Sequence, residues 1–267
     1  MKIAILDLYN QEPNTGIRAI KELIRAHHPE HLFQIFEIRQ QDQWPKISDW
    51  DVFISSGGPG DPTESETIWP AKWKHFFQQL MEYNEQQTPQ KPAFLICYSF
   101  QLFCHHFNLG VASRRYKPSY GSYPCLLSPY GKKDIIFGQL PATFQIADFR
   151  SYQITLPNTK NLKKLEAKIL AMEKERPSIN KAQALMAAQF TPYMYGTQFH
   201  PEANGDKVKE SFKLEEEKLT KFLGNKTYQK AVEKLENVAG INQTQATVLP
   251  RFLDFAMSIV LKNDSKI

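Results

Sequence analysis

The strongest constraint on the fold is a series of short apolar runs that alternate with amphipathic segments. The strand candidates lie at residues 2–8, 31–38, 51–55 and 92–96. Three of them are almost continuously apolar, which is typical of strands buried on both faces of a parallel sheet. Residues 17–24 and about 66–85 instead carry apolar side chains at helical spacing. Strands and helices in this order predict an α/β protein whose functional residues gather at the carboxyl ends of the strands.

The pattern changes twice toward the C-terminus. Residues 116–199 contain shorter β-like runs between Pro, Gly and Asn turns, and they are expected to complete the sheet with antiparallel edge strands. Lys- and Glu-rich helices are predicted over 206–223 and 227–235, followed by a helix over 247–261 with Pro250 near its start. The chain is therefore expected to consist of a domain at residues 1–204 and a helical extension at 205–267 that packs on it.

Composition narrows the class of protein. The 33 basic and 28 acidic residues give a net charge of +5, but the charges are interleaved, which favours a mixed solvated surface over a nucleic-acid-binding patch. No apolar run approaches the ~20 residues that cross a bilayer, and no leader is recognised. Three cysteines, Cys97, Cys104 and Cys125, cannot form a disulfide framework. We expect a cytoplasmic protein that binds neither nucleic acid nor membrane.

Cys97 is the first candidate for chemistry. It directly follows the strand-like run 92–96 and precedes a helix-like segment at 100–107. A sharp strand-to-helix turn lifts a nucleophile above the sheet edge, and the helix N-terminus favours the thiolate and offers N–H donors to an oxyanion. A cysteine in this place without further support is more often a buried structural residue.

Two further segments support a catalytic role for Cys97. In GTQFHPEA, at 196–203, His200 and Glu202 follow another strand-like run, so that the carboxylate can hold the imidazole tautomer while the ring deprotonates a thiol. In SSGGPGDP, at 55–62, a Gly-rich turn after a third strand can direct main-chain N–H groups at a developing oxyanion. These strand ends predict a single site for nucleophilic acyl chemistry.

The combination of GGPG, a cysteine at the strand-to-helix turn and FHPE resembles the class I glutamine amidotransferases, whose nucleophile, base and orienting residue are Cys, His and Glu. The resemblance covers about residues 1–204 and is greatest to stand-alone proteins labelled GMP synthase-like. It implies a flavodoxin-like, mostly parallel sheet with helices on both faces and antiparallel edge strands. It also implies Cys97 as nucleophile, His200 as base and then acid, and Glu202 as its orienting group.

The resemblance implies further site residues. The main-chain N–H groups of Gly58 and Tyr98 would form the oxyanion hole, and Gln101 would help to hold the substrate glutamine. Ser151, Tyr152 and Gln153 fall where family members present a loop to the amino-acid end of that glutamine, a looser correspondence than the others.

The implied reaction releases ammonia from the glutamine side-chain amide through a Cys97 thioester and requires no metal or organic cofactor. No part of the chain remains for a synthetase, so an ammonia acceptor would be handled by a partner enzyme in trans. The Lys- and Glu-rich extension is a candidate docking or homodimer surface, and a solvated helical cover explains it equally well.

The chain departs from the family pattern at the turn, where G-x-C-x-G is usual and this sequence has Leu95 and Ser99. Leu95 requires a smaller neighbour elsewhere. These substitutions favour one alternative, a catalytically silent module that senses glutamine or binds a partner. A second alternative, a hydrolase of other γ-glutamyl amides, also stays open because such enzymes use a similar Cys and His.

A metal site at Cys104, His105 and His106 is not expected. Adjacent residues on a helix diverge by about 100°, so these three side chains cannot converge on one ion. The Gly-rich turn also lacks the Lys-Ser/Thr ending of a phosphate-binding loop.

Overall fold

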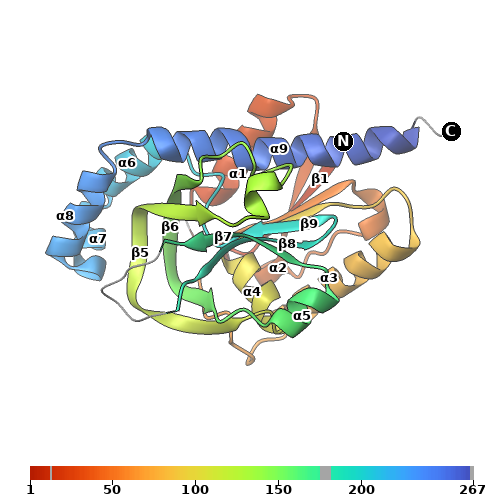
Figure 1. The fold of residues 1–267 in the computed structure, drawn as a ribbon, viewed down its shortest axis with the longest axis horizontal. Helices are drawn as coiled ribbons and strands as arrows, with labels where there is room; N and C mark the ends of the chain where they lie inside the picture. Colours follow the sequence, from red (N-terminus) through yellow and green to blue (C-terminus); the bar gives the residue numbers. More distant parts are fainter. Residues whose placement is uncertain (13, 175–181, 265–267) are drawn as a thin grey trace.

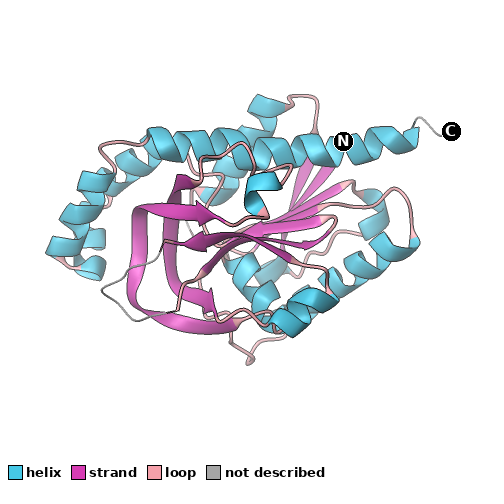
Figure 2. Cartoon of the chain, viewed as in Figure 1, coloured by secondary structure: helices cyan, strands magenta, loops and turns pink. Residues whose placement is uncertain are grey.

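The computed structural model describes residues 1–12, 14–174 and 182–264. Within these ranges the strands form a nine-stranded sheet in the order β2-β1-β3-β4-β9-β8-β7-β5-β6, drawn in magenta in Figure 2. The strands are β1 (Lys2–Asp7), β2 (Leu32–Glu37), β3 (Val52–Ser55), β4 (Ala93–Ile96), β5 (Val111–Leu127), β6 (Thr143–Thr155), β7 (Lys168–Glu173), β8 (Leu185–Thr191) and β9 (Met194–Thr197).

Helices occur before, between and after the strands. The longer ones are α1 (Gly16–His27), α3 (Trp69–Gln86), α4 (Tyr98–His106), α6 (Gly205–Leu214), α7 (Glu216–Leu223), α8 (Asn225–Lys234) and α9 (Ala239–Asp264). The shorter ones are α2 (Ile38–Gln41), α5 (Thr159–Lys164) and the 3₁₀ turns η1 (Ile47–Asp49) and η2 (Gly131–Lys133).

The parallel half of the sheet is buried on both faces. β2, β1, β3, β4 and β9 run parallel, and alternate residues of each strand pack on opposite sides. In β1, Ile3 and Ile5 belong to the core beneath α1 and α9, whereas Ala4 and Leu6 belong to the core beneath α3 and α4. This double burial explains why the apolar runs are continuous and confirms the predicted α/β class.

The antiparallel half extends the sheet from β9 through β8 and β7 to the long pair β5 and β6. The β5–β6 register shifts between Arg114 and Ser119, and the pair curls away from the body of the sheet (Figure 1). Helices α6 to α8 pack against this curled pair through a third apolar cluster that includes Phe212, Leu219 and Tyr228. The predicted antiparallel edge strands are thus confirmed.

The C-terminal helices differ from the prediction in two places. The helix expected over 206–223 is interrupted at Glu215, which separates α6 from α7. The last helix begins at Ala239 rather than near 247, so Pro250 lies in its interior instead of near its start. Proline removes one helical hydrogen bond, and burial of the neighbouring Leu249 and Phe252 in the main core offsets that cost.

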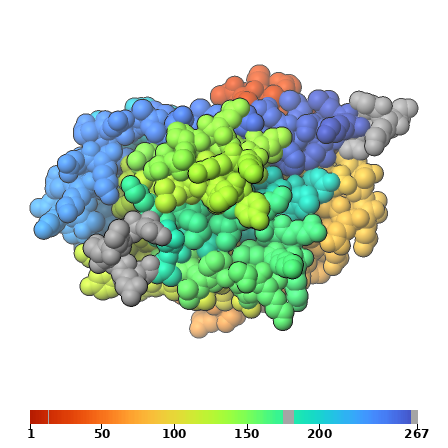
Figure 3. All heavy atoms as spheres, in the orientation of Figure 1, coloured from red at the N-terminus to blue at the C-terminus, as the bar shows by residue number. Residues whose placement is uncertain are grey.

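Helix α9 lies along the whole molecule and is part of its core. Figure 3 shows it, in dark blue, running beside the red N-terminal segment along one edge of this face. Val248, Leu249, Phe252, Leu253 and Ala256 share a cluster with β1, β3 and α1. Among the described helices, none is both long and apolar enough for a bilayer span.

Candidate active site

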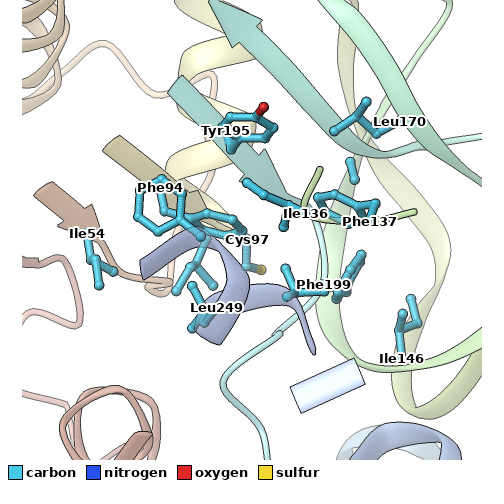
Figure 4. Packing of buried hydrophobic residues seen from close by; sticks show 14 of the residues in the cluster. Ile54, Phe94, Cys97, Ile136, Phe137, Ile146, Leu170, Tyr195, Phe199 and Leu249 are labelled. Atoms are coloured by element: carbon cyan, nitrogen blue, oxygen red, sulfur yellow. The ribbon is translucent and has the colours of Figure 1, made fainter. Parts of the chain in front are cut away.

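Cys97 occupies the strained turn between β4 and α4. Its backbone lies at φ 47° and ψ −95°, a region that non-glycine residues rarely occupy. Its N–H donates to the Thr197 carbonyl at 2.7 Å, and its carbonyl accepts from the Gln101 N–H at 3.0 Å. The turn is therefore held by β9 on one side and by α4 on the other. Cys97 is 5% exposed and lies beside Phe199 and Leu249 (Figure 4).

His200 and Glu202 follow β9, the strand next to β4, and meet the Cys97 turn. Nδ1 of His200 lies 2.8 Å from Oε1 of Glu202, and the two side chains are 10% and 2% exposed. Burial by itself lowers the pKa of His200, but the charges of Glu202 and Cys97, with a hydrogen bond to each side chain, raise it well above its usual value. The imidazole thus pairs with the Glu202 carboxylate and lies within electrostatic reach of the Cys97 thiol.

The backbone around this pair is fixed from two directions. The His200 N–H donates to the Ala147 carbonyl of β6 at 2.9 Å. From α9, the Gln245 side-chain amide donates to the Glu202 carbonyl at 3.1 Å. The C-terminal helix therefore helps to position Glu202, although it is distant in sequence.

Leu95 is accommodated by Gly196, which lies directly opposite it in the β4–β9 pair. A Cβ atom at Gly196 would lie 2.8 Å from the Leu95 carbonyl oxygen and 3.1 Å from the Leu95 Cβ. The missing side chain at Gly196 thus makes room for the carbonyl and Cβ of Leu95 and for the Phe190 ring. This exchange preserves the close approach of the strands beneath the Cys97 turn.

Gly196→Ala is expected to destabilise the protein by about 1–3 kcal/mol, because the added methyl group overpacks the contact with Leu95 and Phe190. The measurement is urea unfolding of the variant and the unmodified protein. The midpoint concentration should be lower in the variant, and the m-value should be the same in both. An unchanged midpoint would show that Leu95 is accommodated elsewhere.

Ser99, the second departure, connects the turn to β3. Its hydroxyl lies 2.7 Å from the Ser55 hydroxyl and donates to the Ser56 carbonyl at 2.6 Å. The Trp73 indole donates to the same Ser55 oxygen at 3.1 Å. These buried hydrogen bonds join α4, α3 and the strand that carries the Gly-rich turn, so the serine adds contacts that a glycine at this place cannot make.

Gly58 follows β3 and Tyr98 begins α4, the two elements that the Ser55–Ser99 contact joins. Tyr98 is the first residue of α4, so its N–H has no acceptor within the helix. A Cβ at Gly58 would lie 2.4 Å from the Leu8 carbonyl oxygen, and one at Gly57 would lie 3.0 Å from Cε1 of His200. The turn 57–60 therefore passes close to the imidazole, at a place that only glycine can occupy.

Gly58→Ala is expected to lower kcat about 10²-fold and to destabilise the protein by about 1–3 kcal/mol, because the turn must move away from Leu8 and its N–H groups move with it. Steady-state glutamate release and a urea unfolding curve measure the two effects. Pro59→Ala in the same turn adds no Cβ and serves as the matched control. Equal kcat values in the two variants would exclude a role for the Gly58 N–H.

Gln101 connects three elements beneath the site. Its Nε2 donates to the Tyr152 carbonyl of β6 at 3.0 Å and to Oε1 of Gln198 at 3.2 Å. Oε1 of Gln198 also accepts from the Ile154 N–H at 2.9 Å. The two hydrogen bonds of Gln101 therefore hold β6 next to the segment that precedes His200.

The segment Ser151–Gln153 belongs to strand β6 rather than to a loop. The Tyr152 hydroxyl donates to Oδ2 of Asp61 at 2.8 Å and so reaches the Gly-rich turn. Oε1 of Gln153 instead accepts from Arg115 at 2.7 Å. The structure thus brings the Tyr152 hydroxyl to the Gly-rich turn, whereas the Gln153 side chain pairs with Arg115 of β5.

Three aromatic residues near Cys97 were not predicted as site residues. Tyr9 follows β1, and burial together with the charges of Glu202 and Cys97 raises the pKa of its hydroxyl well above the usual value. Burial, and to a lesser extent the charge of Cys97, raises the pKa of the Tyr120 hydroxyl of β5. Phe149 of β6 lies 5.5 Å from the His200 ring, between ring centroids. The position of Tyr9 just after a strand was the one available signal.

Helices α6 and α7 pack against two of these aromatic residues, Phe149 and Tyr120. Phe212 of α6 lies 6.1 Å from Phe149, and Phe222 of α7 lies 5.2 Å from Tyr120, between ring centroids. The two helices therefore pack on aromatic side chains of β5 and β6, one of which, Phe149, contacts the His200 ring.

Several solved structures share this fold. A glutamine amidotransferase from Thermotoga maritima is similar with a TM-score of 0.68 at 14% identity, over 96% of this chain and 97% of that one. A putative GMP synthase subunit from Thermoplasma acidophilum gives 0.53 at 18% identity, over 76% and 85%. The CTPS glutaminase domain of Trypanosoma brucei, with bound acivicin, gives 0.54 at 14% identity, over 75% and 86%. None of the curated proteins matches the chain.

The family comparison covers the residues that form the site. The model of the family described as "Glutamine amidotransferase class-I" matches residues 15–215. This range includes Gly58, Cys97, His200 and Glu202. The match spans most of the chain and agrees with the α/β fold and its structural neighbours. The chain belongs to the class I glutamine amidotransferase family.

Proposed function

We propose that the protein hydrolyses the side-chain amide of glutamine through a thioester on Cys97 and supplies the ammonia to an acceptor enzyme in trans. The observation that carries the proposal is the position of the His200 imidazole, between the Glu202 carboxylate and the Cys97 sulfur. The family generally acts on the glutamine amide, which supports the same substrate.

The steps follow from these contacts. The Cys97 thiolate attacks the amide carbon, and the tetrahedral oxyanion is stabilised by the N–H groups of Gly58 and Tyr98. The His200 imidazolium gives its proton to the departing ammonia, and the carbon–nitrogen bond breaks to leave a glutamyl thioester. Neutral His200 then takes a proton from water, whose oxygen attacks the thioester, and glutamate leaves as the thiolate is restored.

Glu202 keeps the imidazole in the required orientation and stabilises its charge. Oε1 of Glu202 faces Nδ1, so the other ring nitrogen is directed to the thiol. Gln101 acts as a positioning residue through Tyr152 and Gln198. Ser151 and Tyr152 contact the amino-acid end of the substrate in this proposal. Because the reaction needs a free thiol, a reducing compartment such as the cytoplasm suits it.

The partner in trans is proposed on one ground. One structural neighbour is named as a putative GMP synthase subunit.

A glutamate-release assay on the purified chain, with glutamine and a γ-glutamyl anilide compared side by side, tests the substrate. We expect glutamine to be the better substrate by kcat/KM. A preference for the anilide would replace the glutaminase with a γ-glutamyl hydrolase. Tight binding of glutamine without glutamate release would favour the silent module that the sequence leaves open.

A further inference from the structure

A cluster of imidazoles and carboxylates lies where the C-terminal end of α1 meets α9. The segment His27-His28-Pro29-Glu30-His31 ends α1 and turns into β2. Asp254 of α9 completes the cluster, from the other end of the chain. The family site at Cys97 uses none of these residues.

The distances within the cluster are those of metal ligands. Oδ1 of Asp254 lies 3.1 Å from Nε2 of His27 and 3.4 Å from Nε2 of His28. The three ligand atoms lie within 4.8 Å of one another. In a tetrahedral zinc site with bonds of 2.0–2.1 Å, ligand atoms are about 3.3 Å apart, so both measured distances already fit.

Glu30 is placed to orient one of these ligands. Its Oε1 lies 3.5 Å from Nδ1 of His28. A carboxylate at Nδ1 holds the proton on that nitrogen and leaves the Nε2 lone pair free to face Asp254 and an ion. Metal-binding histidines commonly have such a carboxylate partner.

His31 provides an independent observation. Its side chain is 2% exposed, and among the described residues neither ring nitrogen has a hydrogen-bond partner. It stacks on His28 with ring centroids 4.4 Å apart, and its Nδ1 lies within 4.8 Å of ligand atoms of His28 and Glu30. A buried imidazole without hydrogen-bond partners costs free energy, and in native proteins such an unsatisfied group commonly indicates a water or ion nearby.

We propose that His27, His28 and Asp254 bind a divalent transition-metal ion, with zinc as the best match, and that Glu30 and His31 complete its surroundings. Two carboxylates, Glu30 and Asp254, balance the charge of a dication, and neutral imidazoles are ordinary zinc ligands. His27 and His28 are 29% and 17% exposed, so an ion and its remaining water ligand can reach the site from solvent.

The bound ion joins the N-terminal helix α1 to the C-terminal helix α9. It holds α9 near Asp254, while Gln245 of the same helix holds the backbone of Glu202. Binding to the folded state alone raises the unfolding temperature with increasing zinc. The role is structural, and no reaction step passes through the ion.

The test uses tag-free Cys97→Ala protein as parent, because the thiol and imidazole at the active site can themselves bind zinc. Zinc binding is measured by calorimetry, and cobalt(II) binding by visible absorption, which is intense for tetrahedral sites. We expect one saturable equivalent of each ion. Added zinc should also raise the unfolding temperature of the parent.

Asp254→Asn is the key variant because Asp254 is half exposed on α9 and its replacement should not disturb folding. We expect Asp254→Asn and His28→Ala to lower zinc affinity at least about tenfold. His75→Ala, which removes an exposed histidine on α3, is the matched control and should bind zinc as the parent does. Parent-like affinity in Asp254→Asn, or no saturable binding by the parent, would overturn the proposal and leave a hydrogen-bonded cluster.

Discussion

Replacing Cys97 by alanine is expected to reduce glutamate release from glutamine by at least about 10⁴-fold, because the thioester can no longer form. The strained backbone at φ 47° is held by Thr197 and Gln101 through main-chain atoms, so the variant should keep the turn. The measurement is single-turnover release of ammonia and glutamate at saturating glutamine, with circular dichroism to establish folding.

Cys104→Ala is the matched control for this result. Cys104 is fully buried on α4, and burial raises the pKa of its thiol well above the usual value, so it stays protonated and unreactive. We expect this variant to keep kcat close to that of the unmodified protein. Comparable losses in the two variants would point to damaged packing rather than to a lost nucleophile.

Glu202→Gln is expected to lower kcat by about 10²–10⁴-fold while the fold is retained. The amide cannot stabilise an imidazolium, and it can present either a donor or an acceptor to Nδ1. Because the Glu202 charge raises the pKa of His200, that pKa should fall in the variant. Proton NMR of the His200 ring across pH measures the shift, and glutamate release measures the rate.

The sign of the pH dependence follows from the raised pKa of His200. Stability gained by holding the imidazolium is fully present below the unfolded value of about 6.5 and is lost as pH rises through the raised folded value. Glu202→Gln lacks this contribution. The part of its loss in free energy of unfolding that comes from His200, relative to the unmodified protein, should therefore shrink at alkaline pH. Glu236→Gln, an exposed acid, is the control, and an unchanged His200 titration in Glu202→Gln would contradict the assigned contact.

The parallel half of the fold could be predicted because double burial makes its strands continuously apolar. The long helix α9 was placed less well. Pro250 suggested a helix start, whereas the buried side chains on either side of it keep the helix continuous from Ala239. The break at Glu215 has no strong local signal, since Glu and Lys occupy both sides of it. Tertiary packing decided both cases.

For the candidate site, residue types and strand ends indicated that Cys97, His200 and Glu202 follow neighbouring strands, and their catalytic roles stay predictions. They could not identify Gly196 as the residue that accommodates Leu95, because the register of β4 and β9 is a tertiary property. They also missed Gln245, whose contact with the Glu202 backbone depends on how α9 docks. Local sequence therefore indicates the candidate reacting groups. The residues that hold these groups in place, such as Gly196 and Gln245, are determined by long-range packing.

The covalent intermediate offers the most direct test of the chemistry. Protein mixed with glutamine is quenched in acid within the first turnover, digested, and examined by mass spectrometry. We predict a glutamyl group in thioester linkage on the peptide that contains Cys97, lost on treatment with hydroxylamine and absent from Cys97→Ala. Glutamate release at full rate from Cys97→Ala, or a glutamyl group on another residue, would contradict nucleophilic catalysis by Cys97.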